Sequence, residues 1–323
     1  MTLSFAGVKD GHLRVVFEVS EDGQVSERFA SKQVTWPWQT AAKSFRKADI
    51  GSKKAEGLRK AWHEHLRSID AIGLRGAFLD SIVELQLPPH HAFPRMARTS
   101  FGDAKSPPWV GAFGSDLQNE AARFRTELVS QLSRLNSVCR VIEPRAENLN
   151  AFGAEIGELL ILSCVGVETC LSSVLRANSH PKTRFTTNDF YELCEPLRLR
   201  EYKLAFADYP WLEPFSPFLE WNSASPTKSL RWYDRYNGEK HDRTNCVRRG
   251  KLIDSFNAIS AFAVLQVAQF GVQPLRDGAG PLNKHFSLVA HPVWPPEQQY
   301  IELHMQAGRI PWCLTPFFNA KHT

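Results

Sequence analysis

The sequence predicts an α+β protein that is mainly helical, with β-strands near both ends. Two Asp-Gly pairs at residues 10–11 and 22–23 separate β-favouring segments near the start. The middle of the chain carries long runs in which apolar residues recur at helical spacing. Near the end, a glycine-rich stretch precedes segments in which apolar and polar residues alternate, which favours strands.

Bulk composition is that of a globular chain. The 323 residues are 43% hydrophobic and 23% charged, which argues against wholesale disorder. The six cysteines are dispersed without a CxxC pair, a usage that favours reduced thiols in a cytoplasmic protein. The first residues lack a basic segment followed by a long apolar run, so we expect no secretory signal.

The first predicted region, residues 1–108, contains β-strands and a connector. Strands over 3–8, 12–19 and 24–29 are expected to form an antiparallel meander, because Asp-Gly supplies the positive φ values of tight hairpins. A polar, helix-favouring run covers 53–71, and the more apolar segment 76–87 could be helix or strand. Five prolines between 88 and 108 mark a connector and a domain boundary.

The second predicted region, residues 109–275, is a helical bundle. An amphipathic helix should start near Asp116 and end before Pro144, and a helix over 154–176 is apolar on most sides and should lie at the centre. Glu168 and several small polar residues interrupt this helix, so we interpret it as a core helix and expect no membrane span. Further helices are predicted over 186–199, breaking near Pro196, and over 230–243 and 249–270. The third region, 276–323, should contribute a strand pair formed by 286–290 and 301–305.

Residues 231–243 hold the densest chemistry in the chain. From 228 to 251 there are eight basic residues and three acidic ones, an excess as large as the formal net charge of +5 for the whole protein. Such a field favours a polyanionic partner, because phosphates gain Coulomb energy and release counterions on binding. The alternative is a solvated basic face.

On an ideal helix, Asn237 and His241 lie on one face, while Trp232 and Tyr236 fall on the opposite side. The aromatic side chains would then be buried and the histidine held outward beside an amide and cations. This arrangement suits phosphate chemistry, since histidine can move a proton and arginine stabilises charge on phosphorus. Gly238 costs a helix about 1 kcal/mol relative to alanine, so the helix could instead begin there.

The same run carries a recognisable motif, in which an aromatic pair precedes an amide, a histidine and two cations: Trp232-Tyr233, then Tyr236-Asn237-x-x-Lys240-His241-x-Arg243. This motif resembles the signature of HEPN-like proteins (higher eukaryote and prokaryote nucleotide-binding), a superfamily of helical bundles. The segment 209–221, with Pro217-Phe218 before a tryptophan, also resembles what bacterial members place ahead of the signature. The likeness covers residues 150 to 270.

The resemblance implies metal-independent cleavage of RNA, in which the ribose 2′-hydroxyl attacks the adjacent phosphate and leaves a cyclic phosphate. His241 would transfer protons, Arg235 or Arg243 would stabilise the phosphorane, and Asn237 would supply the polar residue. In HEPN ribonucleases the arginine of the motif is followed directly by a polar residue. Here Tyr236 follows Arg235, and the amide residue Asn237 comes one position later. The expected RNA-contacting residues are Lys240, Arg231, Arg248 and Arg249.

The resemblance also implies a homodimer whose two motifs share one cleft, and a bacterial toxin or antiphage role. No cofactor is expected. Many superfamily members look non-catalytic, so the alternative is a module that binds nucleotide, RNA or another protein.

No metal site is expected, because the histidine pairs His63-x-His65 and His90-His91 lack cysteine or carboxylate ligands at recognisable spacing. Glu168 could pair with Arg235 or Arg243, since a buried carboxylate needs a partner.

Overall fold

The protein is described from a computed structural model. It describes residues 3–10, 12–19, 25–29, 56–60, 62–63, 79–98, 100–101, 115–241, 250–272, 275, 282–301 and 312–320. Both helices and strands are present, which confirms the mixed α+β class. Within the predicted helix over 53–71, residues 56–60 and 62–63 are helical, and the rest lies outside the described residues.

The chain folds into two compact units, each assembled from separated segments. Unit 1 comprises residues 1–92, 98–107 and 293–314, and unit 2 comprises 93–97, 108–292 and 315–323. The sequence predicts three consecutive regions, whereas the contacts assign the short segments 93–97 and 315–323 to the helical unit. Aromatic packing accounts for part of this assignment, since the rings of Phe93 and Phe317 meet edge to face with centroids 5.1 Å apart.

Unit 1 is built around a four-stranded antiparallel sheet. It contains β1 (Leu3–Lys9), β2 (His12–Val19), β3 (Val25–Phe29) and β4 (Ser81–Glu84), in the order β3-β2-β1-β4. The ambiguous segment 76–87 therefore contributes a strand. One apolar cluster covers the sheet, and its buried members are Ala6, Val8, Leu13, Val16, Leu85 and Ile301.

Two short parallel pairs bring the C-terminal part of the chain into unit 1. β5 (His91–Ala92) pairs with β10 (Cys313–Leu314), and β6 (Ser100–Phe101) pairs with β9 (Tyr300–Ile301). The predicted pairing of 286–290 with 301–305 is wrong, because β8 (Phe286–Ala290) pairs antiparallel with β7 (Lys203–Phe206) in unit 2. Residues 302–305 lie outside the described part.

Aromatic packing explains why β8 pairs with β7. Phe206 and Phe286 are register partners, and their ring centroids are 5.0 Å apart. The Phe206 ring also meets Phe256 of the last long helix edge to face at 4.9 Å. The β7–β8 pair is therefore packed on the helical core by its phenylalanines.

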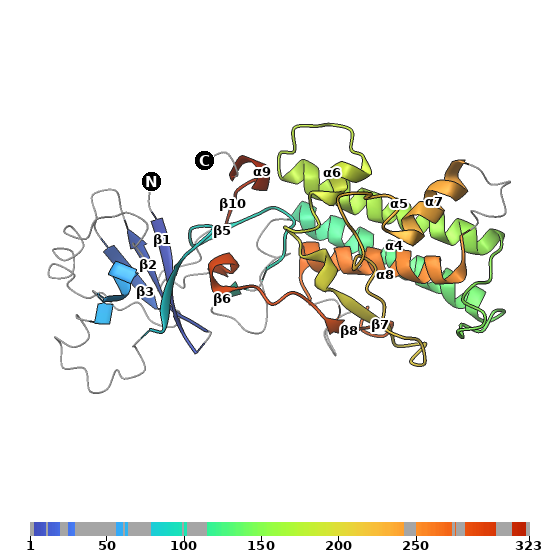
Figure 1. Cartoon of the computed structure of the whole chain (residues 1–323), viewed down its shortest axis with the longest axis horizontal. Helices are drawn as coiled ribbons and strands as arrows, with labels where there is room; N and C mark the ends of the chain where they lie inside the picture. Colours follow the sequence, from blue (N-terminus) through green and yellow to red (C-terminus); the bar gives the residue numbers. More distant parts are fainter. Residues whose placement is uncertain are drawn as a thin grey trace. The chain divides into compact units, whose positions relative to one another are not determined.

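Three long helices form the centre of unit 2: α4 (Ser115–Cys139), α5 (Ala154–Ala177) and α8 (Leu252–Phe270). Each of them contacts the other two, and α7 (Arg231–His241) packs on α5 and α8 (Figure 1). α4 buries one stripe at helical spacing, with Ala121, Phe124, Leu128, Leu132 and Leu135. The predicted ranges of these helices differ from the observed ones by a few residues at their ends.

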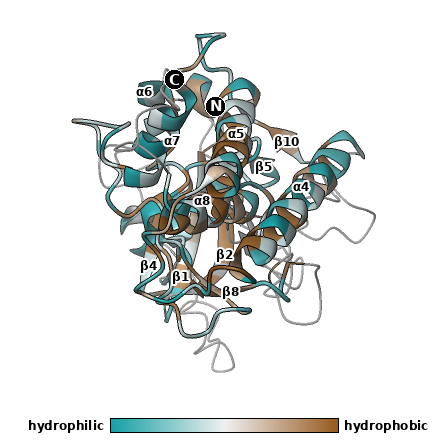
Figure 2. Cartoon of the chain, turned by 90° about the vertical axis from the view of Figure 1, so that its right-hand side faces the viewer, coloured by the Kyte–Doolittle hydropathy of each residue, from teal (hydrophilic) through white to brown (hydrophobic). Residues whose placement is uncertain are grey.

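Helices α5 and α8 supply the apolar core of unit 2, which is plain in the hydropathy colouring of Figure 2. Both are long and apolar enough to cross a membrane by length and composition. However, 56% of the apolar 18-residue stretch in α5 and 89% of the corresponding stretch in α8 are buried inside the protein. This burial is typical of core helices.

The shorter elements depart more from the prediction. α6 (Thr187–Tyr191) ends earlier than the helix predicted over 186–199, because Leu193 and Cys194 bond to the carbonyls three residues back and end the α-helical pattern. A 3-10 turn, η2 (Leu199–Glu201), follows after Arg198, which has a φ of 49°. The remaining elements are η5 (Pro296–Gln298) and α9 (Phe317–Ala320).

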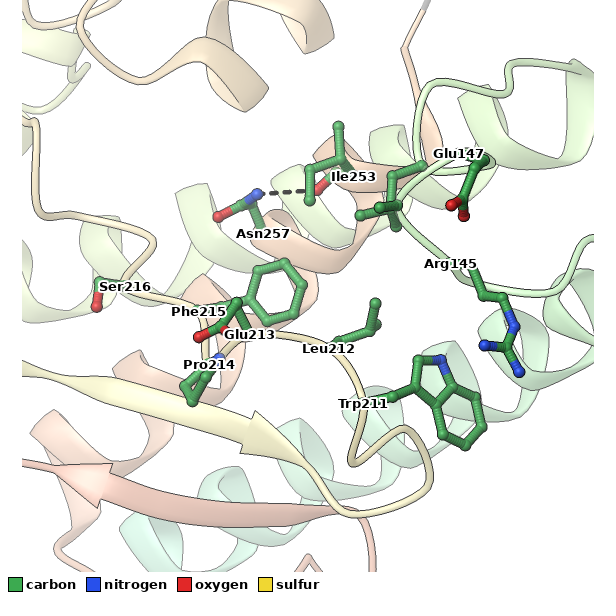
Figure 3. Close-up of a pocket in the computed structure, with 12 residues that line it drawn as sticks. Arg145, Glu147, Trp211, Leu212, Glu213, Pro214, Phe215, Ser216, Ile253 and Asn257 are labelled. Carbon is green, nitrogen blue, oxygen red and sulfur yellow. Dashed lines mark hydrogen bonds between the residues drawn. The ribbon is translucent and has the colours of Figure 1, made fainter.

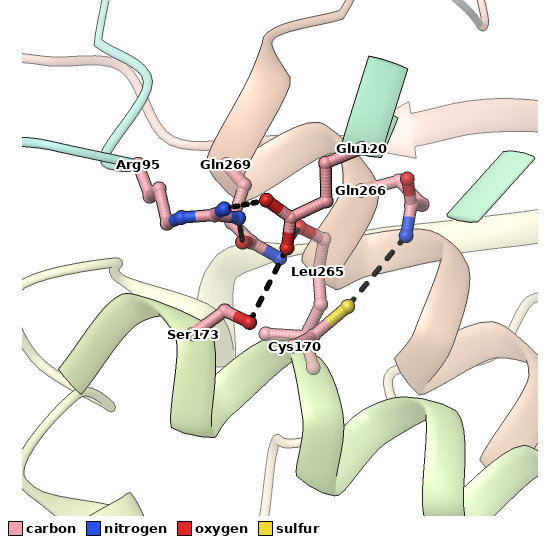
Figure 4. A network of polar contacts seen from close by, with 7 residues as sticks. All are labelled: Arg95, Glu120, Cys170, Ser173, Leu265, Gln266 and Gln269. Atoms are coloured by element: carbon pink, nitrogen blue, oxygen red, sulfur yellow. Dashed lines mark hydrogen bonds and ion pairs between the residues drawn. The ribbon is translucent and has the colours of Figure 1, made fainter. Parts of the chain in front are cut away.

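Polar contacts attach segment 93–97 to the helices of unit 2 (Figure 4). The Arg95 guanidinium forms an ion pair with Glu120 of α4 and donates to Oε1 of Gln269 of α8 at 3.2 Å. The same glutamate accepts from the Ser173 hydroxyl of α5 at 3.5 Å. Arg95 thus joins α4 and α8, and Glu120 links them to α5.

Asn178 attaches both short segments to the end of α5. Its amide nitrogen donates to the Pro94 carbonyl at 2.7 Å and the Val174 carbonyl at 2.9 Å, and its oxygen accepts from the Phe317 amide at 3.0 Å. The side chain is fully buried. Its loss would leave backbone groups of two distant segments without their partners.

We therefore expect Asn178→Ala to lower the free energy of unfolding by about 1–3 kcal/mol, the cost of leaving buried backbone groups unpaired. Urea denaturation followed by circular dichroism measures the change. Asn188→Ala, at an exposed position of α6, is the matched control and should leave stability unchanged. Equal stabilities for the two variants would contradict the anchoring role.

Candidate functional site

Helix α7 has an aromatic side that faces the protein and a polar side that does not. Trp232, Tyr233 and Tyr236 are buried, with Tyr236 only 1% exposed. The Trp232 indole donates to the Pro217 carbonyl at 2.9 Å and meets Phe218 edge to face. This is the orientation that helical spacing predicts for the aromatic residues.

Glu168 of α5 fixes the aromatic side of α7. Its carboxylate accepts hydrogen bonds from the Tyr233 hydroxyl at 2.6 Å and the Tyr236 hydroxyl at 3.3 Å. Burial raises the pKa of both hydroxyls well above the ordinary value, and Glu168 raises them further, so both tyrosines remain donors. The two hydroxyls are thus partners of the Glu168 carboxylate on α7. Pairing of Glu168 with Arg235 or Arg243 stays a prediction, and Arg243 lies outside the described residues.

Lys240 belongs to the same side of the helix as the tyrosines. Its ammonium lies 3.3 Å from the Tyr236 hydroxyl oxygen and 5.4 Å from the centroid of the Tyr236 ring. Because Lys240 follows Tyr236 by one helical turn, its side chain extends beside the buried aromatic residues. The structure thus separates Lys240 from Arg231, with which the sequence groups it.

The polar side of α7 opens into a hollow at the beginning of the helix. This hollow, the α7 pocket, has a volume of about 490 Å³ and is lined by Glu220, Asn222, Lys228, Ser229, Arg231, Asp234 and Arg235. Three of these side chains are cations and two are carboxylates. Arg231 and Arg235, both predicted site residues, therefore lie together with Lys228, which sequence reasoning did not single out.

A buried carboxylate lies within electrostatic reach of the two arginines. Asp254, at the start of α8, is 2% exposed and accepts a hydrogen bond from the Lys251 amide at 2.9 Å. Burial raises the pKa of its carboxyl, while the Lys251 amide and then the charges of Arg235 and Arg231 act against that rise. The charges of the two arginines thus favour the ionised form of this carboxyl.

The other predicted catalytic residues lie toward the end of α7. Asn237 is half-buried, and its side-chain amide makes no hydrogen bond within the described part of the chain. His241 is the last described residue of the helix, and only its backbone is described. The helix continues through Gly238, so it does not begin there. Arg243, Arg248 and Arg249 lie outside the described residues.

A close approach to α5 positions this end of α7. A Cβ added at Gly157 of α5 would lie 2.3 Å from Oε1 of Glu239, so the glycine makes room for that carboxylate. The other oxygen of Glu239 is buried and has no hydrogen-bond partner among the described residues. The carboxylate lies against the first turns of α5, where the helix dipole favours negative charge.

One group among the described residues has the composition of a metal site. The ligating atoms of His180, Asp189 and Glu192 lie within 4.8 Å of one another. However, the Lys182 amide donates to Nδ1 of His180 at 3.2 Å, which leaves the proton of the neutral ring on Nε2, the atom that faces Glu192. The Lys182 ammonium already pairs with Asp189. These contacts favour a structural cluster over a metal centre.

The histidine pairs considered from the sequence also make structural contacts. Nε2 of His63 accepts from the Leu79 amide at 3.1 Å, and the His90 ring packs against Trp312. His65 lies outside the described residues. His91 is half-buried, and burial lowers its pKa.

Helix α7 should depend on the Glu168–Tyr233 hydrogen bond for its position. A double-mutant cycle with Glu168→Gln and Tyr233→Phe should give a coupling of about 1.5 kcal/mol, typical of a hydrogen bond to a charged group. Thermal or urea unfolding of the four proteins provides the measurement. Additive effects of the two substitutions would exclude this role.

The capping box of α6, formed by Thr186 and Asp189, should make the stability of the protein depend on pH in acid. Burial alone would raise the pKa of the Asp189 carboxyl, but hydrogen bonds from Lys182 and Thr186 outweigh it and hold the pKa at about 2. Because the folded-state pKa is depressed, this stabilisation is present above the unfolded-state value of about 4 and is lost as the pH falls toward about 2. Asp189→Asn should remove that part of the acid dependence, which urea midpoints measured between pH 5 and pH 2 would test.

Comparison with known proteins gives no further assignment. No protein-family model, curated protein or solved structure matches this chain. The relation to HEPN-like proteins therefore rests on the motif alone, and the arrangement around α7 has to support any functional proposal.

Proposed function

We propose that the polar side of α7 binds RNA and cleaves it without a metal ion, with α4, α5, α7 and α8 as a HEPN-like bundle. The observation that carries the proposal is the two-sided nature of α7. Its aromatic side is fixed by Glu168, and its polar side holds Arg231 and Arg235 at a hollow large enough for a nucleotide-sized group.

The proposed contacts follow from the charges of that hollow. Lys228, Arg231 and Arg235 are the cations that would bind phosphate oxygens, while the hydroxyl of Ser229 and the amide of Asn222 would donate hydrogen bonds. Asp234 and Glu220 repel phosphates and would restrict where the backbone of the nucleic acid lies. Arg243, Arg248 and Arg249 would extend this surface.

In the proposed reaction, His241 removes the proton from a ribose 2′-hydroxyl. The 2′-oxygen forms a bond to the adjacent phosphorus, the bond from phosphorus to the 5′-oxygen breaks, and the leaving oxygen takes up a proton. Arg235 or Arg243 stabilises the extra negative charge on the phosphorane, and the Asn237 amide orients a phosphate oxygen. The resemblance further suggests that two copies pair and share the cleft, and that the protein acts as a toxin or antiphage effector.

Binding without cleavage is a second candidate, and the position of Asp254 favours it. This buried carboxylate lies within electrostatic reach of Arg235 and Arg231, whose charges favour its ionised form. The two arginines can therefore serve the fold without taking part in catalysis. A module that only binds nucleotide, RNA or a protein would keep the same basic hollow. The two candidates differ in whether His241 is needed for turnover.

Incubation of the full-length protein with labelled total RNA and tRNA in EDTA tests the first candidate. Wild type should leave fragments with cyclic phosphate ends, and His241→Ala should be slower by about a hundredfold or more while still binding RNA. Absence of cleavage by a folded, RNA-binding wild type would support the second candidate. Cleavage that survives His241→Ala would refute the assignment of the catalytic residue.

Binding at the α7 pocket has a separate test. Lys228→Gln should weaken RNA binding and reduce the slope of log affinity against log salt by about one, as expected when one phosphate contact is lost. Arg184→Gln, at an exposed position outside the pocket, is the matched control and removes the same charge. Equal effects of the two substitutions would show that RNA does not contact the pocket.

A further inference from the structure

A second hollow in unit 2 shares no lining residue with the α7 pocket. This Trp211 pocket has a volume of about 540 Å³ and is drawn in Figure 3. Three segments line it: the turn after α4, the segment that follows β7, and the first turns of α8. Its lining residues are Arg145, Ala146, Glu147, Leu149, Trp211, Leu212, Glu213, Pro214, Phe215, Ser216, Ile253 and Asn257.

The apolar part of the pocket is held rigidly. The Phe215 ring stacks on Phe256 of α8 with centroids 5.5 Å apart and an angle of 8° between the planes. Ile253 is tied to the turn after α4, since its amide donates to the Leu149 carbonyl at 3.0 Å. A preformed apolar surface of this kind can cover the stem of a ligand without a cost of ordering.

Trp211 is the exceptional residue of the pocket, because 51% of its surface is exposed. Its indole nitrogen donates to the Pro144 carbonyl at 2.8 Å, which holds the ring in place. The guanidinium carbon of Arg145 lies 5.8 Å from the ring centroid. The indole face is therefore fixed, accessible and already in contact with a cation from the same chain.

Negative charge surrounds this ring. Arg145 is neutralised by Glu143 at 2.8 Å, whereas Glu147 and Glu213 are exposed and form no ion pair within the described residues. The chain as a whole has a formal net charge of +5, so the sign of the local charge is inverted here. The side-chain nitrogen of Asn257 donates to the Ile253 carbonyl at 2.9 Å. Its side-chain oxygen makes no hydrogen bond within the described residues and adds an acceptor to the pocket.

We propose that the Trp211 pocket binds an organic cation carried on an apolar stem, a guanidinium or an alkylammonium group. The carboxylates of Glu147 and Glu213 and the face of Trp211 attract the charge, and the apolar residues cover the stem. The same carboxylates disfavour phosphates, so the ligand class differs from that of the α7 pocket. The group can belong to a basic peptide side chain or to a free amine.

Calorimetric titration of the full-length protein identifies the ligand class. N-acetyl-arginine methylamide represents the peptide side chain, agmatine represents the free amine, and N-acetyl-norleucine methylamide supplies a neutral stem. At least one cation should bind saturably and about fivefold more tightly than the neutral compound, and the stronger of the two cations identifies the source. Failure of both cations to bind, or equal binding of the neutral compound, would overturn the proposal.

Substitutions locate the binding. Trp211→Leu should weaken cation binding by about two- to fivefold, the loss expected of one exposed cation–π contact. Glu213→Gln should weaken it as well, whereas Glu158→Gln, at an exposed position of α5 outside the pocket, is the charge-matched control. Because Glu213 is a surface residue, its variant should remain folded. Unchanged affinity in both pocket variants would place the binding elsewhere.

Substitution of Arg145 should strengthen cation binding, whereas the substitutions of Trp211 and Glu213 should weaken it. If its guanidinium competes for the face of Trp211, Arg145→Gln should strengthen cation binding more than Arg140→Gln, which removes an exposed arginine after α4 outside the pocket. Equal effects would show that only net charge matters and that the indole face is not the binding surface.

Discussion

The close packing of α5 against α8 is the constraint on which the rest of unit 2 depends. A Cβ added at Gly166 of α5 would lie 3.0 Å from ring atoms of Phe262 of α8, so the absence of a side chain lets the ring fit against the helix. α5 also contacts α4, α6 and α7. A larger residue at position 166 would therefore disturb the core that all the other helices share.

Glu168, one of the three glutamates of α5, has a large influence on the position of α7. Glu168 is the residue to which the two tyrosines of α7 donate, and it thereby determines which side of α7 faces solvent. The hollow of Lys228, Arg231 and Arg235 exists because the aromatic residues are held on the other side. A polar surface is thus oriented by a hydrogen bond from its buried side.

The sequence predicts local features well and tertiary partners poorly. Helical spacing places Trp232 and Tyr236 on the buried side of α7, because periodicity within one element is local information. The counter-charge of Arg235 could not be found in this way, since Asp254 lies on another helix and its burial depends on the fold. Likewise, alternation within residues 286–290 indicates a strand but does not say that Lys203–Phe206 is its neighbour. The Trp211 pocket brings together three segments whose proximity no motif indicates.

The two parallel strand pairs of unit 1 have a consequence for the order of folding during synthesis. β5 and β6 leave the ribosome long before their partners, since His91 pairs with Cys313 and Ser100 with Tyr300. At typical rates of about 5–20 residues per second, β5 and β6 must wait on the order of ten seconds or more for these partner strands. Unit 2 is almost fully emerged by then. The unit whose synthesis begins first is therefore completed only when nearly the whole chain has been made, and its unpaired strand edges are exposed to other chains in the meantime.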